Sequence, residues 1–109
     1  MITAVIYKNS DDEILGFHTT GHAGYDRYGR DIICAAVSAL SINAVNSIEA
    51  LTADRFKVEQ ADGDLKFKLL TKDKPETQLL LKSFVLGLES IQETYGDRYI
   101  RIIIRIREV

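Results

Sequence analysis

Residues 32–51, IICAAVSALSINAVNSIEAL, decide the fold of this chain, because they form its longest segment with a helical repeat of apolar residues. Apolar side chains recur every three or four residues, which places them on one side of an α-helix. Asp31 stands directly before the segment and is a typical N-cap residue. We therefore expect a helix from Ile32 to about Leu51 with an apolar stripe facing a core. The stripe consists of Ile33, Val37, Leu40, Ala44, Ile48 and Leu51.

Segments in which hydrophobic and polar residues alternate stand on both sides of this helix, as half-buried strands require. The clearest is the last, where Ile100, Ile102, Ile104 and Ile106 point to one side. A second helix is expected to open near Pro75 and to stop at Gly96. Its apolar stripe consists of Leu80, Phe84, Leu88, Ile91 and Tyr95. The predicted strands cover about residues 2–8, 14–21, 55–60, 64–70 and 99–107, and an Asp-Gly turn at 61–64 joins the third to the fourth.

These elements follow one another in the order β-β-α-β-β-α-β, and from the second strand onward they form the split β-α-β-β-α-β unit. Each helix has one apolar stripe and each strand one apolar face, which a two-layer packing buries together. We therefore expect an α/β (α+β) two-layer sandwich, with one mixed sheet and both helices packed on one of its faces. Because domains usually span roughly 100–150 residues, the 109 residues should form a single domain, 1–109.

Composition limits both the partners and the compartment of the protein. The chain has 14 Lys and Arg against 16 Asp and Glu residues, so its formal net charge is −2. This balance gives no long-range attraction to nucleic acid or to an anionic membrane, and any basic site must be local. One cysteine cannot form an internal disulfide, which favours a reducing, cytoplasmic setting. The first residues lack the signals of an export sequence, and no membrane span is expected.

The residues with catalytic potential lie around a glycine-rich segment, residues 21–30, between the second strand and the first helix. Cys34 lies in the first turn of that helix, where free N–H groups and the helix dipole favour a thiolate and lower the thiol pKa. His22 stands 12 residues earlier, and the glycines between them let the chain fold back. A nucleophilic thiol needs a base, so His22 is the candidate partner. The alternative from the residues alone is a small packed cysteine and a structural histidine.

The same segment resembles the signature of a known family. The matching residues are Gly21-His22-Ala23, Gly29 and Asp31-Ile32-Ile33-Cys34-Ala35-Ala36-Val37-Ser38, and the family is the ribosomal-processing cysteine protease family, Prp. The resemblance implies a cysteine endopeptidase that removes the N-terminal extension of a bacterial large-subunit ribosomal protein through an acyl-enzyme. It also implies a homodimer that needs no cofactor, with the ribosomal protein precursor as its partner.

Carried over to this sequence, the resemblance makes Cys34 the nucleophile and His22 the general base and later the general acid. The main-chain N–H groups of Ile33, Cys34 and Ala35 are a candidate oxyanion hole. Asp31 is a candidate to orient His22, although its position favours the role of helix N-cap. The glycine-rich loop is a candidate flap that closes over a bound peptide. The residues of this flap are Gly21, Gly24, Tyr25, Tyr28 and Gly29.

Two further groups of residues were weighed as sites. His18 and His22 share one side of the second strand and suggest a two-histidine metal site. Zinc needs three or four ligands, so this constellation is incomplete and no metal site is predicted. Ser38, Ser41 and Asn43 lie off the core stripe of the first helix and are either exposed to solvent or part of a dimer contact.

A basic edge on the last strand leaves a rival function open. It consists of Arg98, Arg101, Arg105 and Arg107, and it is either a solvated sheet face or a contact with RNA or with an acidic partner. The rival is a non-enzymatic ribosome- or RNA-associated α/β module, since split units often bind RNA. The acidic net charge and the absence of an aromatic-rich basic strand motif argue against direct nucleic-acid binding. A purely structural subunit would leave the glycine-rich loop without a role.

Overall fold

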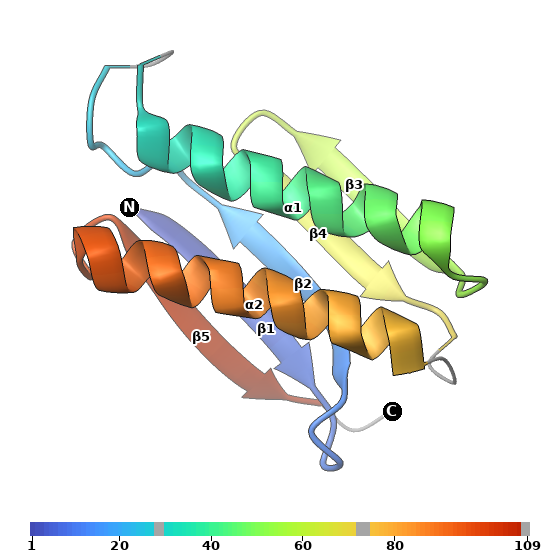
Figure 1. Ribbon diagram of the computed structural model, residues 1–109. Helices are drawn as coiled ribbons and strands as arrows, with labels where there is room; N and C mark the ends of the chain where they lie inside the picture. Colours follow the sequence, from blue (N-terminus) through green and yellow to red (C-terminus); the bar gives the residue numbers. More distant parts are fainter. Residues whose placement is uncertain (28–29, 72–74, 108–109) are drawn as a thin grey trace.

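The computed structural model describes residues 1–27, 30–71 and 75–107, which form one five-stranded sheet with both helices on one of its faces (Figure 1). The strand order is β3-β4-β2-β1-β5; β1 and β5 pair in parallel and the other pairs are antiparallel. The mixed two-layer sandwich and its β-β-α-β-β-α-β order are therefore confirmed. The elements are β1 (Ile2–Lys8), β2 (Ile14–Thr20), α1 (Ile32–Leu51), β3 (Phe56–Ala61), β4 (Asp64–Leu69), α2 (Pro75–Tyr95) and β5 (Ile100–Ile106).

The core lies between the helices and the sheet, and aromatic rings occupy its centre. The ring of Phe17 in β2 lies 5.2 Å from that of Phe67 in β4 and 4.4 Å from that of Phe84 in α2. Burying a Phe side chain contributes about 1.5–3 kcal/mol, so these rings account for a large share of the stability of the fold. The predicted positions Ile33 and Ile48 of α1 are both fully buried in the same core.

Helix α1 differs from its predicted pattern at two positions. Leu51 is 70 % exposed, because it is the last residue of the helix. Ser41 was expected at the surface but is buried, and its hydroxyl donates a hydrogen bond to the carbonyl of Val37 at 2.7 Å. A hydroxyl satisfied by the preceding turn can face a core, which a pattern of apolar residues does not reveal. By length and apolar composition α1 could cross a membrane, but it is a core helix here, with Ile48 buried.

Helix α2 packs closely on α1 and turns a slightly different side to the core than predicted. Leu81 is completely buried, although it lay outside the expected stripe, whereas Tyr95 is exposed. A Cβ added to Gly87 would lie 2.8 Å from Cδ1 of Leu40, so the absence of a side chain at Gly87 lets the two helices approach. The buried side of α2 consists of Thr77, Leu81, Phe84 and Leu88.

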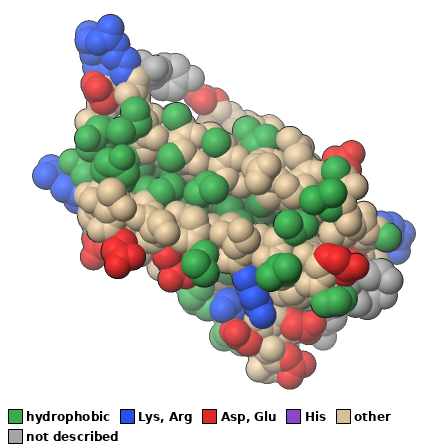
Figure 2. All heavy atoms as spheres, viewed as in Figure 1, with side chains coloured by type: hydrophobic (Ala, Val, Ile, Leu, Met, Phe, Trp, Pro, Cys, Tyr) green, Lys and Arg blue, Asp and Glu red, His purple; other side chains and the backbone are tan. Residues whose placement is uncertain are grey.

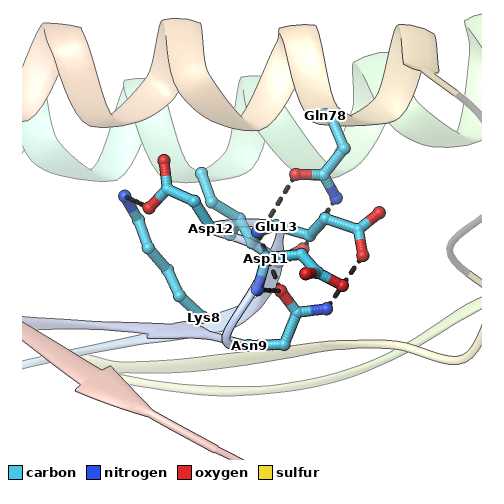
Figure 3. A network of polar contacts seen from close by, with 7 residues as sticks. Lys8, Asn9, Asp11, Asp12, Glu13 and Gln78 are labelled. Atoms are coloured by element: carbon cyan, nitrogen blue, oxygen red, sulfur yellow. Dashed lines mark hydrogen bonds and ion pairs between the residues drawn. The ribbon is translucent and has the colours of Figure 1, made fainter.

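A polar network ties the start of α2 to the β1–β2 turn (Figure 3). Asn9 Oδ1 accepts hydrogen bonds from the N–H groups of Asp11 and Glu13, both at 3.0 Å. The side chain of Gln78 binds both the N–H and the carbonyl of Ile14, at 2.8 and 2.9 Å. The first turns of α2 therefore lie over β2, at the end of that strand opposite to Thr20.

The position of α2 explains why part of β5 is uncovered. Ile104 and Ile106 are 47 % and 57 % exposed, although the alternating pattern suggested one continuous apolar side from Ile100 to Ile106. The strand β5 is an edge strand, separated from β2 by β1. Because the start of α2 lies over β2, no helix covers the end of β5. Alternation correctly predicted the strand but could not predict how far the helix layer extends.

Candidate active site

His22 and Cys34 lie together where β2 leads into α1. The two side chains approach with Nδ1 of His22 3.9 Å from Sγ of Cys34. The N–H of Ala23, the residue between β2 and the loop, donates a hydrogen bond to the same sulfur at 3.1 Å. The structure therefore brings together the two residues that the sequence analysis paired. The sulfur is only partly buried, so a substrate can reach it.

Asp31 is the N-cap of α1 and also holds the loop. Its Oδ1 accepts hydrogen bonds from the N–H groups of Ile33 and Cys34, both at 3.0 Å. Its Oδ2 accepts one from the N–H of Tyr25 at 2.9 Å. Burial alone would raise the pKa of the Asp31 carboxyl, but the N–H donors, with that of Cys34 first among them, hold this pKa below its ordinary value. Asp31 is therefore an anion at neutral pH, with its charge directed at the first turn of α1.

The thiol of Cys34 has a raised pKa, contrary to the expectation from the helix dipole. Burial is the largest cause, and the negative charge of Asp31 raises the pKa further. The hydrogen bond from Ala23 acts in the opposite direction and does not outweigh them. In this conformation Cys34 is therefore a protonated thiol at neutral pH, and its ionisation requires a base.

The expected oxyanion hole is not available in this conformation. The N–H groups of Ile33 and Cys34 donate to the Asp31 side chain, and that of Ala35 donates to the Asp31 carbonyl at 3.0 Å. N–H groups already used in this way are not free to bind an oxyanion in this conformation, because the N-cap residue satisfies the same first-turn donors that the prediction treated as free. The oxyanion role of Ile33 and Ala35 therefore stays a prediction, and it requires these donors to be released when substrate binds. The N–H of Ala23 is directed at the sulfur, where it can stabilise a thiolate.

The turn between β3 and β4 supports the ring of His22, a contact that the sequence analysis missed. A Cβ added to Gly63 would lie 2.9 Å from Nε2 of His22, and Gly63 has a φ of +68°, a left-handed backbone that favours glycine. The N–H of Gly21 donates to the carbonyl of Gly63 at 2.9 Å. The Asp-Gly pair was visible in the sequence as a turn signal. Its role beside His22 depends on the pairing of β4 with β2, which no local pattern reveals.

A cleft of about 790 Å³ runs past the sulfur. Helix α1 forms one wall and the β3–β4 turn the other, with the end of β2 between them. Ser38 and Ser41, weighed as dimer contacts, instead line this cleft together with His22 and Cys34. The cleft therefore offers room for a peptide beside the thiol, with Ser38 on one wall; the hydroxyl of Ser41 is already bonded to the carbonyl of Val37.

The loop that was predicted as a flap is attached to residues that lie near the other end of the chain in sequence. The ring of Tyr25 lies edge-on to Tyr95 at 5.6 Å and to Tyr99 at 5.2 Å, at the junction of α2 and β5. Gly21 and Gly24 of the same loop line the cleft. The predicted flap positions Tyr28 and Gly29 lie outside the described residues.

His18 is engaged away from the thiol. Its Nε2 lies 3.0 Å from Oδ1 of Asp64 in the neighbouring strand β4. The two histidines are therefore used separately, His18 beside Asp64 and His22 beside Cys34. Within residues 1–27, 30–71 and 75–107, no group of three or more His, Cys, Asp and Glu side chains is arranged to hold a metal ion.

Comparisons with known proteins agree with this arrangement. The family model described as Cysteine protease Prp matches residues 1–101. Two relatives are each 33 % identical to this chain, and each match covers 89 % of it. One is the ribosomal processing cysteine protease Prp of Staphylococcus aureus (strain Mu50 / ATCC 700699), of which the match covers 93 %. The other is the protein of the same name from Bacillus subtilis (strain 168), of which the match covers 92 %. A crystal structure of the S. aureus protease with a covalently linked product peptide superposes with a TM-score of 0.92, at 32 % identity, over 96 % of this chain and 100 % of that one. This chain therefore belongs to the Prp family of cysteine proteases.

Proposed function

We propose that Cys34 and His22 form the catalytic dyad of an endopeptidase that removes the N-terminal extension of a large-subunit ribosomal protein. The observation that carries the proposal is the approach of His22 Nδ1 to within 3.9 Å of Cys34 Sγ beside a cleft of about 790 Å³. The covalently linked product peptide on the S. aureus relative supports a nucleophilic mechanism for this fold. The ribosomal substrate is inferred from the names of the two relatives.

The reaction follows acyl-transfer chemistry. His22 takes the proton from the Cys34 thiol, and the thiolate attacks the carbonyl carbon of the scissile peptide bond. The tetrahedral intermediate collapses, the C–N bond breaks, and the leaving amine takes the proton back from His22. Water, activated by His22, then attacks the thioester, and the free acid leaves as Cys34 regains its proton. The N–H of Ala23 stabilises the negative sulfur at the start and end of this cycle.

Activation of the thiol is coupled to substrate binding. At 3.9 Å the contact between His22 and Cys34 is longer than the distance of about 3 Å at which protons are transferred efficiently. The raised thiol pKa likewise keeps the sulfur protonated in this conformation. A peptide lying in the cleft excludes water and presses the loop against the thiol, which shortens the contact and favours the ion pair. The enzyme therefore has a weakly reactive thiol until its substrate is bound.

The proposal is tested by incubating the purified protein with an extended ribosomal protein precursor. Replacing Cys34 by Ala should abolish cleavage and leave precursor binding intact. Replacing His22 by Ala should slow turnover about 10²–10⁴-fold, because a positioned general base contributes that much. His18→Ala is the matched control, since it removes the other histidine without touching the thiol. Undiminished cleavage by the Cys34→Ala protein would refute the assignment.

We also propose that the protein acts in the cytoplasm as a homodimer. Hydrophobic side chains gather over the outer surface of the two helices (Figure 2). Among them Ile42, Leu79 and Leu86 are 40 %, 69 % and 63 % exposed, and a second copy would cover them. A single cysteine and a ribosomal substrate both fit the cytoplasm. Sedimentation should give a dimer for the unmodified protein and a monomer for Leu86→Lys; a monomer in both cases would rule the dimer out.

A further inference from the structure

The sheet face opposite the helices carries positive charge that the protease reaction does not use. Ile2, Ala4 and Ile6 of β1 are buried under the helices, so alternate residues of each strand face the other way. Two carboxylates of the strands, Glu59 and Asp64, lie on this open face. Its cationic side chains are Lys57, Lys66, Lys68, Arg101, Arg105 and Arg107. Six cations and two carboxylates give a formal charge of +4, although the chain of 109 residues has a net charge of −2.

Three of the six cations lie in one row across the sheet. Strand pairing aligns Lys57, Lys68, Gly16, Tyr7 and Arg105 from one edge to the other. This row crosses four strand spacings, about 19 Å. Lys57 and Lys68 are directly paired, which disfavours the sheet because their charges repel.

Little within the protein offsets this repulsion. Of the six cations on the open face, only Lys57 makes an ion pair with a described residue, and that contact, with Glu59, is 3.7 Å long and exposed. A protein retains an arrangement that destabilises its fold where the arrangement has a function. The row therefore has the properties of a binding surface for a polyanion.

A hollow at the centre of the row adds a place for a planar group. Gly16 contributes no side chain there, and a cavity of about 590 Å³ is lined by Tyr7, Gly16, His18, Lys66, Lys68 and Arg107 among others. The guanidinium of Arg107 lies over the Tyr7 ring, 5.2 Å from its centroid. An aromatic ring among cations on a flat sheet is how such sheets bind single-stranded nucleic acid, because bases stack and phosphates pair with Lys and Arg.

We propose that the open sheet face, centred on Tyr7 and Lys68, binds single-stranded RNA. The cations contact phosphates on both sides of the hollow, and one base enters the hollow beside Tyr7. With one aromatic residue, binding should depend strongly on salt and weakly on base sequence. An acidic peptide would match the charge, but RNA supplies a planar base with every phosphate, which fits a hollow surrounded by cations.

The RNA site and the peptide cleft are separate. The row lies at the Tyr7 end of β1, whereas the cleft is bordered by Ile2 and by Thr20, the partner of Thr3. Four residues from Thr3 to Tyr7 correspond to about 13 Å along the strand. The proposed face is also on the side of the sheet away from the helices. RNA and substrate peptide can therefore be bound at the same time.

The test measures fluorescence anisotropy of a labelled RNA of about 12 nucleotides, long enough to cross the sheet. Lys68→Gln with Arg105→Gln should weaken binding about tenfold and reduce the slope of log affinity against log salt by about 1.4, for two lost phosphate contacts. Lys82→Gln with Arg27→Gln, which removes the same charge from α2 and from the loop before α1, should change affinity less than about twofold. Peptide cleavage by the Lys68→Gln/Arg105→Gln protein should be unchanged. Should that pair disturb folding, Lys57→Gln with Arg101→Gln gives the same comparison.

Three results would overturn the proposal. The first is no change in anisotropy with the unmodified protein at low salt. The second is an equal loss of affinity in the Lys82→Gln/Arg27→Gln control, which would mean that net charge alone governs binding. The third is displacement of the RNA by poly-glutamate of matched charge at equal concentration, which would indicate an acidic polypeptide as the partner. The failure of this site would leave the assignment of Cys34 and His22 untouched.

Discussion

At the scale of single residues, Asp31 adds to the effect of burial in raising the pKa of the Cys34 thiol. It caps α1, accepts the N–H of Tyr25 and raises the thiol pKa by its charge. Its capping role could be predicted from its position before an apolar helix. That its charge opposes ionisation of the thiol could also be predicted from its proximity in sequence. Whether this effect and burial together outweigh the helix dipole could not, because the balance depends on how deeply the sulfur is buried and on which donors the carboxylate has already taken. The same contacts explain why the N–H groups of Ile33 and Ala35 are not free.

Replacing Asp31 by Asn should lower the pKa of the Cys34 thiol. Asn still caps the helix, but the negative charge that raises the thiol pKa is removed. In the unmodified protein the alkylation rate with iodoacetamide should reach half its maximum above pH 9.0, the ordinary value for the thiol, because the folded protein favours the protonated form. The midpoint should move to lower pH in the Asp31→Asn protein and stay in place in Asp26→Asn, a matched charge change. A midpoint shared by all three proteins would show that Asp31 does not act on the thiol.

The contact between Gly63 and His22 gives a second prediction at this scale. Gly63→Ala should slow peptide cleavage about 10–100-fold through kcat, because the new methyl group displaces the imidazole from the thiol. Gly96→Ala is the matched control, since Gly96 also has a positive φ, +99°, with nothing within 4 Å of the added Cβ. Both proteins should lose about 1–2 kcal/mol of stability from the left-handed backbone. Equal activity in the two would mean that the turn does not position His22.

At the scale of elements, the connection from β2 to α1 is the part that sequence reasoning described least well. Its glycines predicted a free flap, whereas Tyr25 is anchored on the rings of Tyr95 and Tyr99. Those rings belong to the end of α2 and the residue before β5. Only the assembled fold places them beside the loop, so neither spacing nor composition could have identified the contact.

The anchor predicts how the loop responds to trypsin, which cuts after arginine. Tyr25→Ala removes two ring contacts, each contributing about 0.5–1.5 kcal/mol, so the loop should open about tenfold more often. Cleavage after Arg27 should accelerate by the same factor, as followed by mass spectrometry. Tyr25→Phe keeps the rings and should match the unmodified protein. Equal cleavage rates in all three proteins would contradict an anchored loop.

The helices and strands themselves were predictable, because in each of them the apolar residues repeat at the helical or strand spacing over most of its length. All five strands and both helices lie within a few residues of the predicted bounds. The errors concern how elements meet: Ser41 is buried, and Ile104 is exposed. Ser41 can be buried because its hydroxyl has an acceptor in the preceding turn. Ile104 is exposed because the start of α2 lies over β2 and not over the end of β5. Both outcomes depend on three-dimensional packing.

At the scale of the whole molecule, the fold is one sheet with a helix layer on a single side. The chain belongs to a family of cysteine proteases, which confirms the enzymatic interpretation over the two rivals, the non-enzymatic module and the structural subunit.

The layered packing predicts that neighbouring leucines of α2 differ greatly in their contribution to stability. Leu81→Ala should reduce the free energy of unfolding by about 2–5 kcal/mol, because Leu81 is completely buried. Leu79→Ala, at a site 69 % exposed in the single chain, should change it by less than about 0.5 kcal/mol when both variants are made in the Leu86→Lys protein, in which the proposed dimer contact is broken. Urea unfolding of both variants measures the difference, and similar losses would contradict the packing of α2.

The support of His22 by Gly63 has a consequence for the timing of activity during synthesis of the enzyme. Both residues of the dyad lie in the first third of the chain, but the wall that holds His22 belongs to the β3–β4 turn. That turn reaches His22 only after β4 has paired with β2. A nascent chain that has not yet emerged as far as β4 carries nucleophile and base without the means to align them. We therefore expect the protease to gain its full activity only after β4 has folded onto β2, so that a truncated product of translation should attack other newly made proteins only weakly.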